Sequence, residues 1–147
     1  MDERNYGVCM ELIIGGCFQG KLDYAKQRCK EAGICVREEE ILDGGKMPAE
    51  EYRERTGAPV RILNHLHLVV RQYVETGKEQ EIIPLLDRLL MKYPDMLIVC
   101  DEVGLGLVPV GETQQEYREA VGRTLCHLAR QAVHMVRITA GIPLVIR

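Results

Sequence analysis

Apolar and polar residues alternate along this chain with two different periods. Unbroken apolar runs at 12–14 and 96–100 predict strands that are buried on both faces of a sheet. Apolar residues recur at helical spacing after Lys21, across 79–93 and after Thr113, so these segments predict amphipathic helices. Buried strands that alternate with helices are typical of an α/β protein. We therefore expect a three-layer α/β fold with a mostly parallel sheet flanked by helices.

Turn residues set the expected boundaries in the first half of the chain. Gly33 ends the first helix and precedes a predicted second strand at 34–38. The Asp-Gly-Gly sequence at 43–45 predicts a turn, because glycine and aspartate favour turn conformations. A short polar helix is predicted at 48–55, with a proline at its first turn.

The second half contains one ambiguous segment and one cap signal. Residues 60–76 fit either one continuous helix or a strand at 60–63 that leads into a helix. Thr113 followed by Glu116 has the pattern of a capping box, so the last helix is expected to begin there. A strand is then predicted at 133–139.

Composition and charge narrow the class of protein. At 147 residues, with 46% hydrophobic and 28% charged residues, the chain is predicted to form a single domain, 1–147. The net charge of −3 is spread over interspersed residues and gives no nucleic-acid footprint. No apolar run approaches the roughly 20 residues of a membrane span, and the first residues are acidic and polar. We therefore expect a cytoplasmic protein whose six cysteines are free thiols.

The stretch from the first strand into the first helix carries a phosphate-binding pattern. Gly15, four residues, Gly20 and Lys21 fit G-x-x-x-x-G-K-[ST] except at the last position, where Leu22 stands in place of a hydroxyl residue. Glycines let the backbone curl around a phosphate, and the helix N-terminus adds positive potential. The alternative is a strand-to-helix turn that uses glycine for its conformation alone. The expected nucleotide contacts are Gly15, Gly16, Cys17, Phe18, Gln19, Gly20, Lys21 and Leu22.

A second candidate site follows the apolar run at 96–100. Asp101 and Glu102 end that predicted strand, where an acid of a nucleotide-dependent transferase binds Mg²⁺ directly or through water. The alternative is an acidic strand end that faces solvent. Arg118 and Arg123 leave the apolar face of the last helix and either contact phosphates or form surface salt bridges.

Two histidines lie in the ambiguous segment at 60–76. His65 and His67 would not share a face of a helix, whereas in an extended segment they could bind one metal ion. The alternative is that one histidine faces solvent and the other lines the edge of the core. No third ligand is evident in the sequence.

Three C-terminal motifs together resemble one family. They are Asp-Glu-Val-Gly-Leu-Gly-Leu-Val-Pro at 101–109, Tyr-Arg-Glu-Ala-Val-Gly-Arg at 117–123, and Ala-Gly-Ile-Pro-Leu-Val-Ile-Arg at 140–147. With the glycines and lysine of 15–21, these motifs resemble the bifunctional adenosylcobinamide kinase / adenosylcobinamide-phosphate guanylyltransferase family of cobalamin synthesis. The order of the motifs and their spacing to the C-terminus carry the resemblance.

The resemblance implies a fold, a chemistry and a set of roles. It implies a P-loop-type nucleotide-binding domain, GTP or ATP with Mg²⁺ as cofactors, adenosylcobinamide as the acceptor, and a homotrimer. Lys21 and Glu102 would then be catalytic, and Asp101 would be the metal ligand. The expected contacts to substrate or phosphate are Asp101, Gly104, Arg118 and Arg123.

The chain departs from the family pattern at several positions. The family passes GMP through a histidine shortly after its second strand, but residues 37–59 contain no histidine. Gln19 and Leu22 replace the two serines of the family loop, and Asp101 replaces an asparagine. The alternative function is a catalytically degenerate nucleotide- or corrinoid-binding module that partners an active paralogue. The sequence leaves the choice between ATP and GTP open.

Overall fold

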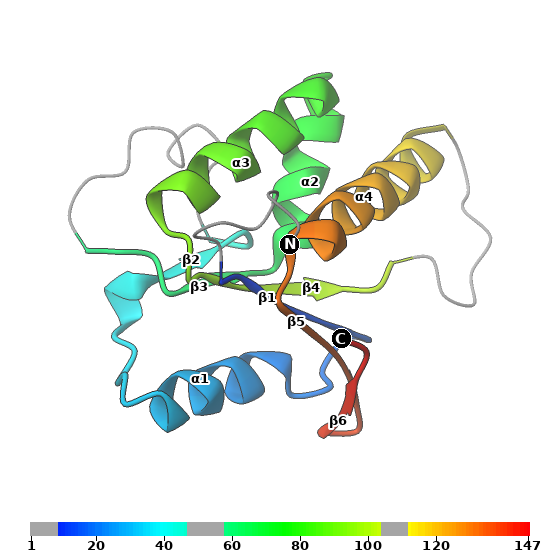
Figure 1. The fold of residues 1–147 in the computed structure, drawn as a ribbon. Coiled ribbons are helices and arrows are strands. Elements are labelled where there is room, and N and C mark those ends of the chain that lie inside the picture. The colour runs from blue at the N-terminus through cyan, green and yellow to red at the C-terminus, as the bar shows by residue number, and fades with distance from the viewer. Residues whose placement is uncertain (1–8, 47–57, 104–111) are drawn as a thin grey trace.

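The structure, a computed structural model, describes residues 9–46, 58–103 and 112–147, and within them forms a six-stranded sheet (Figure 1). The strand order is β2-β3-β4-β1-β5-β6, in which the first five strands are parallel and β6 runs antiparallel to β5. The strands are β1 Glu11–Gly15, β2 Ile41–Asp43, β3 Ile62–Asn64, β4 Leu97–Asp101, β5 His134–Thr139 and β6 Ile142–Val145.

Helices cover both faces of the sheet and make the fold three-layered. The α-helices are α1 Lys21–Glu31, α2 Leu66–Glu75, α3 Ile82–Lys92 and α4 Glu112–Gln131, with short 3₁₀ turns at Glu38–Glu40 and Glu79–Glu81. Figure 1 shows α1 alone on one face, whereas α2, α3 and α4 lie together on the other. The predicted α/β fold with a mostly parallel sheet flanked by helices is confirmed.

The apolar runs of the sequence form the central strands because both faces of the sheet are covered. In β1, Leu12 and Ile14 belong to the apolar core beneath α2, α3 and α4, whereas Ile13 packs with the smaller core beneath α1. In β4, Ile98 and Val99 divide in the same way. Successive side chains of a strand point to opposite faces, so a strand between two helical layers must be apolar throughout.

The predicted strand at 34–38 is wrong, and β2 forms instead at Ile41–Asp43. Gly33 ends α1 in the left-handed conformation, and the Ile34 N–H returns to the Cys29 carbonyl at 2.9 Å. Ile34 is partly buried against the core beneath α1 but pairs with no strand. An apolar, β-branched segment was therefore mistaken for a strand because its side chains pack without a ladder.

The ambiguous segment at 60–76 resolves into strand β3 followed by helix α2, with His65 between them. The predicted helix at 79–93 is observed as a 3₁₀ turn followed by α3. The predicted cap at Thr113 is wrong, because α4 begins at Glu112 and already contains Thr113. The predicted helix at 48–55 falls almost wholly outside the described residues.

The register of the strands brings the last residues of four strands to the same edge of the sheet. Gly15 of β1 lies opposite Asp101 of β4, and Asp43 of β2 lies opposite Asn64 of β3. Because these strands are parallel, their carboxyl ends meet at the same edge of the sheet, where ligands bind in open α/β folds.

Across the parts of the chain that the structure describes, no helix is both long and apolar enough to cross a membrane.

Candidate functional site

The loop from β1 to α1 is fixed by close backbone contacts. Gly15 must be glycine, because a Cβ there would lie 2.5 Å from the Ile138 carbonyl oxygen of β5. Phe18 and Gly20 have positive φ angles of 56° and 84°, which turn the chain sharply into the helix. The Gln19 carbonyl accepts a hydrogen bond of 3.1 Å from the Gly141 N–H. The turn between β5 and β6 therefore holds the loop from outside.

The loop contains backbone N–H groups that are not used in hydrogen bonds within the described residues. Among the described residues, none accepts a hydrogen bond from the N–H groups of 17–21. These groups precede or open α1, whose N-terminus carries partial positive charge. Successive free N–H groups at a helix N-terminus form a binding site for phosphate or another anion. The loop therefore has the backbone geometry of an anion site.

Lys21 is a buried cation at the base of this loop. Its side chain is only 6% exposed, and Nζ lies 2.7 Å from Asp101 Oδ1. The same ammonium donates a hydrogen bond to the Gly16 carbonyl oxygen. A charge out of water needs such partners, because an unpaired buried ammonium would cost several kcal/mol. The pair places one positive and one negative group beside the loop, which Lys21 itself contacts at Gly16.

His67 holds Asp101 from the other side. The Asp101 backbone N–H donates to His67 Nδ1 at 3.1 Å, so this nitrogen carries no proton and Nε2 carries it instead. Nε2 lies 3.4 Å from Asp101 Oδ2. Burial lowers the pKa of His67 and outweighs the attraction of the Asp101 carboxylate. At neutral pH the ring is therefore neutral, and it orients Asp101 without competing with Lys21 for its charge.

A second group of polar residues faces the loop from β2 and β3. Asp43 ends β2, and its Oδ1 lies 2.8 Å from His65 Nδ1. Asn64 ends β3 and places its amide nitrogen 3.5 Å from Asp43 Oδ2. Burial raises the pKa of Asp43, but hydrogen bonds from His65 and the Gly45 N–H outweigh burial and lower it overall. Asp43 is therefore a carboxylate at neutral pH.

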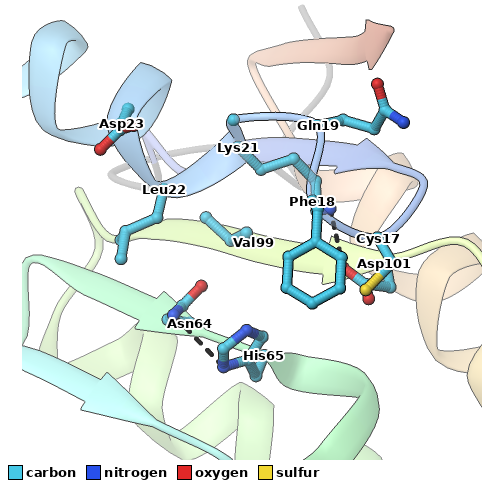
Figure 2. Close-up of a pocket in the computed structure, with 11 residues that line it drawn as sticks. Cys17, Phe18, Gln19, Lys21, Leu22, Asp23, Asn64, His65, Val99 and Asp101 are labelled. Carbon is cyan, nitrogen blue, oxygen red and sulfur yellow. Dashed lines mark hydrogen bonds and ion pairs between the residues drawn. The ribbon is translucent and has the colours of Figure 1, made fainter. Parts of the chain in front are cut away.

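The loop, Asn64 and His65 line one pocket, shown in Figure 2. Its cavity of about 170 Å³ is smaller than the roughly 300–1,000 Å³ of a pocket that encloses a whole ligand, so it can take in only part of a nucleotide. Phe18 is 98% exposed and stands at the mouth of the pocket, with His65 across from it (Figure 2). The lining residues are Cys17, Phe18, Gln19, Gly20, Lys21, Leu22, Asp23, Asn64, His65, Val99 and Asp101.

Most of the expected nucleotide contacts thus line the pocket, but other expected site residues lie elsewhere. Glu102 turns away from the pocket, and its carboxylate pairs with Arg137 of β5 at 2.7 Å. Arg123 pairs with Glu79 and lies on the outer surface of α4. Arg118 is exposed on the same helix. Gly104 lies outside the described residues.

The donors present do not fit a Mg²⁺ ion held by protein ligands alone. Leu22 has no hydroxyl to offer, and both oxygens of Asp101 already contact Lys21 or His67. The rings of His65 and His67 meet edge to face with centroids 5.5 Å apart. Over 9–46, 58–103 and 112–147, no group of three or more His, Cys, Asp or Glu side chains could hold a metal ion.

Asp43 does not line the pocket but contacts His65, which does, and the sequence does not single it out as a site residue. The sequence predicts Asp43 only as part of a turn, because the apolar run at 34–38 gives the stronger strand signal. In open α/β folds, ligands bind at the carboxyl ends of the parallel strands. With β2 at Ile41–Asp43, these ends carry Asp43 on β2 and Asn64 on β3, with His65 directly after it. A correct second strand was therefore the signal that would have found the group.

Comparison with known proteins identifies a family for most of the chain. The profile of the family described as Cobinamide kinase / cobinamide phosphate guanyltransferase matches residues 40–146, well over half of the chain. No curated protein matches the chain. The matched region includes Asp43, Asn64, His65 and Asp101, whereas the loop at 15–21 precedes it.

Proposed function

Because the chain belongs to the cobinamide kinase / cobinamide phosphate guanyltransferase family, we propose that it binds a purine nucleoside triphosphate at residues 15–21 and transfers its γ-phosphoryl group to adenosylcobinamide. The observation that carries this proposal is the loop with unused N–H groups above the buried Lys21. It lies at the carboxyl edge of the sheet, where open α/β folds bind their ligands.

The chemistry of phosphoryl transfer suits these residues. The transition state spreads negative charge over the transferred group, so positioning and charge neutralisation supply most of the catalysis. The loop N–H groups would hold the outer phosphates in place, and Lys21 would neutralise their charge. On phosphate binding, Nζ would exchange part of its 2.7 Å contact with Asp101 for a contact with the ligand, because both partners are anions.

The same features support a weak dependence on Mg²⁺. In nucleotide hydrolases with this type of loop, a hydroxyl after the lysine holds the metal ion. Leu22 cannot do this, and Asp101 is occupied on both oxygens. We therefore propose that nucleotide affinity depends chiefly on the loop and Lys21 and little on Mg²⁺.

A second candidate function is a nucleotide- or corrinoid-binding module without catalysis. Two features favour it. Leu22 stands where the loop pattern has a hydroxyl residue, and residues 37–59 contain no histidine, whereas family members carry their guanylylated histidine in that segment. Guanylyl transfer through that histidine is therefore not part of our proposal. A module of this kind would bind nucleotide as the kinase does and would transfer nothing.

The proposal is tested by titrating ATP and GTP into the wild-type protein and a Lys21→Ala variant, with and without Mg²⁺. Removing one charged hydrogen-bond donor costs roughly 1.5–3 kcal/mol, so affinity should fall by roughly 10- to 150-fold in calorimetry. Omitting Mg²⁺ should change the wild-type affinity much less than the substitution does.

Lys26→Ala is the matched control, because Lys26 lies on the same helix and is exposed. It should bind nucleotide as the wild type does. Equal affinity of Lys21→Ala and wild type would show that the loop is a turn without a binding role. Thermal unfolding of Lys21→Ala checks that the loss of its ion pair has not unfolded the protein.

A further inference from the structure

His65 has one ring nitrogen that is held and one that faces the pocket. Asp43 Oδ1 lies 2.8 Å from Nδ1. A carboxylate only accepts hydrogen bonds, so Nδ1 carries the proton and Nε2 keeps a free lone pair. Figure 2 shows Nδ1 turned toward Asn64 and the other ring nitrogen directed toward the loop and Val99. Within the described residues, Nε2 has no hydrogen-bond partner.

The backbone is built to hold the ring in this place. His65 has φ 57° and ψ 49°, a left-handed conformation that is uncommon for a residue with a side chain. Such conformations persist only where the surroundings impose them, and they cluster at functional sites. Gly44 packs so closely that a Cβ there would lie 2.4 Å from the His65 carbonyl oxygen. Asp43 is fixed in turn by the Gly45 N–H, which donates to Oδ1 at 2.8 Å.

We propose that His65, oriented by Asp43, is the general base of phosphoryl transfer in this pocket; the inference rests on the proposed function. The acceptor hydroxyl oxygen attacks the γ-phosphorus, and its proton passes to Nε2 of His65. The bond from the γ-phosphorus to the bridging oxygen breaks, and the nucleoside diphosphate leaves with that electron pair. Asp43 stabilises the resulting imidazolium. His65 then loses the proton to water, since its side chain is 41% exposed.

The buried titratable groups around the pocket are already engaged, whereas Cys17 and Asp23 line it as exposed groups. Both ring nitrogens of His67 face Asp101, and both oxygens of Asp101 face Lys21 or His67. Lys21 is held as a cation by Asp101 and has no lone pair to accept a proton. His65 therefore stands out in the pocket lining as an imidazole with a free lone pair.

The test is a His65→Asn variant in a transfer assay with γ-labelled ATP or GTP and adenosylcobinamide. Asparagine tolerates the left-handed conformation, and its amide N–H lies where Nδ1–H reaches Asp43. It has nothing at the position of Nε2. A lost general base lowers turnover by roughly 10²- to 10⁴-fold, so kcat should fall by that factor while nucleotide affinity is kept.

His127→Asn is the matched control. His127 Nε2 lies 2.7 Å from Asp87, so this histidine–aspartate pair lies on α4 and α3, away from the pocket. Its replacement should leave kcat unchanged. A His65→Gly variant gives a second reading, because glycine also adopts the left-handed conformation. Imidazole in solution should restore part of its activity, which no loss of structure alone would explain.

Three results would overturn the inference in different ways. Wild-type kcat in His65→Asn would remove His65 from the reaction and leave the proposed function standing. An acid-labile, base-stable label on His65 after incubation with α-labelled GTP would make it a nucleophile instead of a base. A wild-type protein that binds nucleotide but transfers nothing would overturn the base together with the kinase step, and would leave the binding module.

Discussion

At the scale of single residues, Lys21 and Asp101 show how one ion pair can prepare a site. Each group would be costly to bury alone, and together they sit 2.7 Å apart beside the neutral ring of His67. Because His67 adds no charge, we expect an arriving phosphate to find Lys21 already positioned. The pair thus links the sequence pattern at 15–21 to the acid that ends β4.

Cys17 offers a test of this site at the same scale. It is exposed and lines the pocket within the loop, so bound nucleotide should shield it. Burial raises the pKa of Cys100 to about 12 and also raises that of Cys29, so these two thiols should react slowly. We expect brief alkylation followed by mass spectrometry to show labelling of Cys17 that nucleotide suppresses.

Cys35 and Cys126 serve as internal controls for that experiment, because both are exposed and neither lines the pocket. Their labelling should be the same with and without nucleotide. Equal labelling of Cys17 in both conditions would place the nucleotide elsewhere.

At the scale of elements, a buried carboxylate fixes the edge of the sheet. Glu40 is 6% exposed and accepts hydrogen bonds from Arg37 Nε at 3.0 Å and Arg61 Nε at 3.2 Å. The Arg61 N–H also donates to the Glu40 carbonyl oxygen at 2.8 Å. These bonds tie the chain before β2 to the chain before β3. They therefore set the position of Asp43, three residues after Glu40.

Stability should depend on pH through this carboxylate. Hydrogen bonds from Arg37 are the main cause that lowers the pKa of Glu40 below its ordinary 4.5. A carboxyl whose pKa is lowered by folding stabilises the protein above its unfolded pKa, and that stability is lost as pH falls through the folded pKa. Wild type should therefore be more stable than Glu40→Gln at neutral pH, and the gap should shrink at acid pH.

Urea unfolding of both proteins at neutral pH and at about pH 3 measures that gap. Glu39→Gln is the control, because Glu39 pairs with the same Arg37 but its side chain is 56% exposed and screened by solvent. A gap between wild type and Glu40→Gln that stays constant with pH would mean that Glu40 does not contribute through its charge.

The same edge marks the limit of what the sequence predicted. Strands buried on both faces were found because their apolar runs are unambiguous, as at 96–100. The strand of three residues at Ile41–Asp43 was missed, since Ile34 and Val36 give the stronger apolar signal nearby. Those side chains pack against α1 without pairing, and only the tertiary structure separates packing from pairing.

At the scale of the whole molecule, the pocket is built from segments far apart in the sequence. The loop after β1, Asn64 at the end of β3 with His65 after it, and Asp101 of β4 meet because three parallel strands end at one edge. Sequence reasoning found the loop and Asp101, which each carry a local pattern. It could not find the Asp43–His65 pair, since this contact depends on the register of β2 against β3.

A ligand that bridges these segments should stabilise the whole fold. Binding to the folded state alone, at 100 times the dissociation constant, adds about 2.7 kcal/mol. For a chain of 147 residues this raises the melting temperature by roughly 5–11 °C. We therefore expect a thermal shift of that size with ATP or GTP in the wild-type protein, measured by calorimetry or by circular dichroism.

Lys21→Ala should show a much smaller shift at the same nucleotide concentration, because the loop loses its charge but keeps its backbone. Adenosine or guanosine, which lack phosphates, should shift wild type and variant alike and only slightly. A large shift with the nucleosides would mean that the base, and not the phosphate loop, supplies the binding energy.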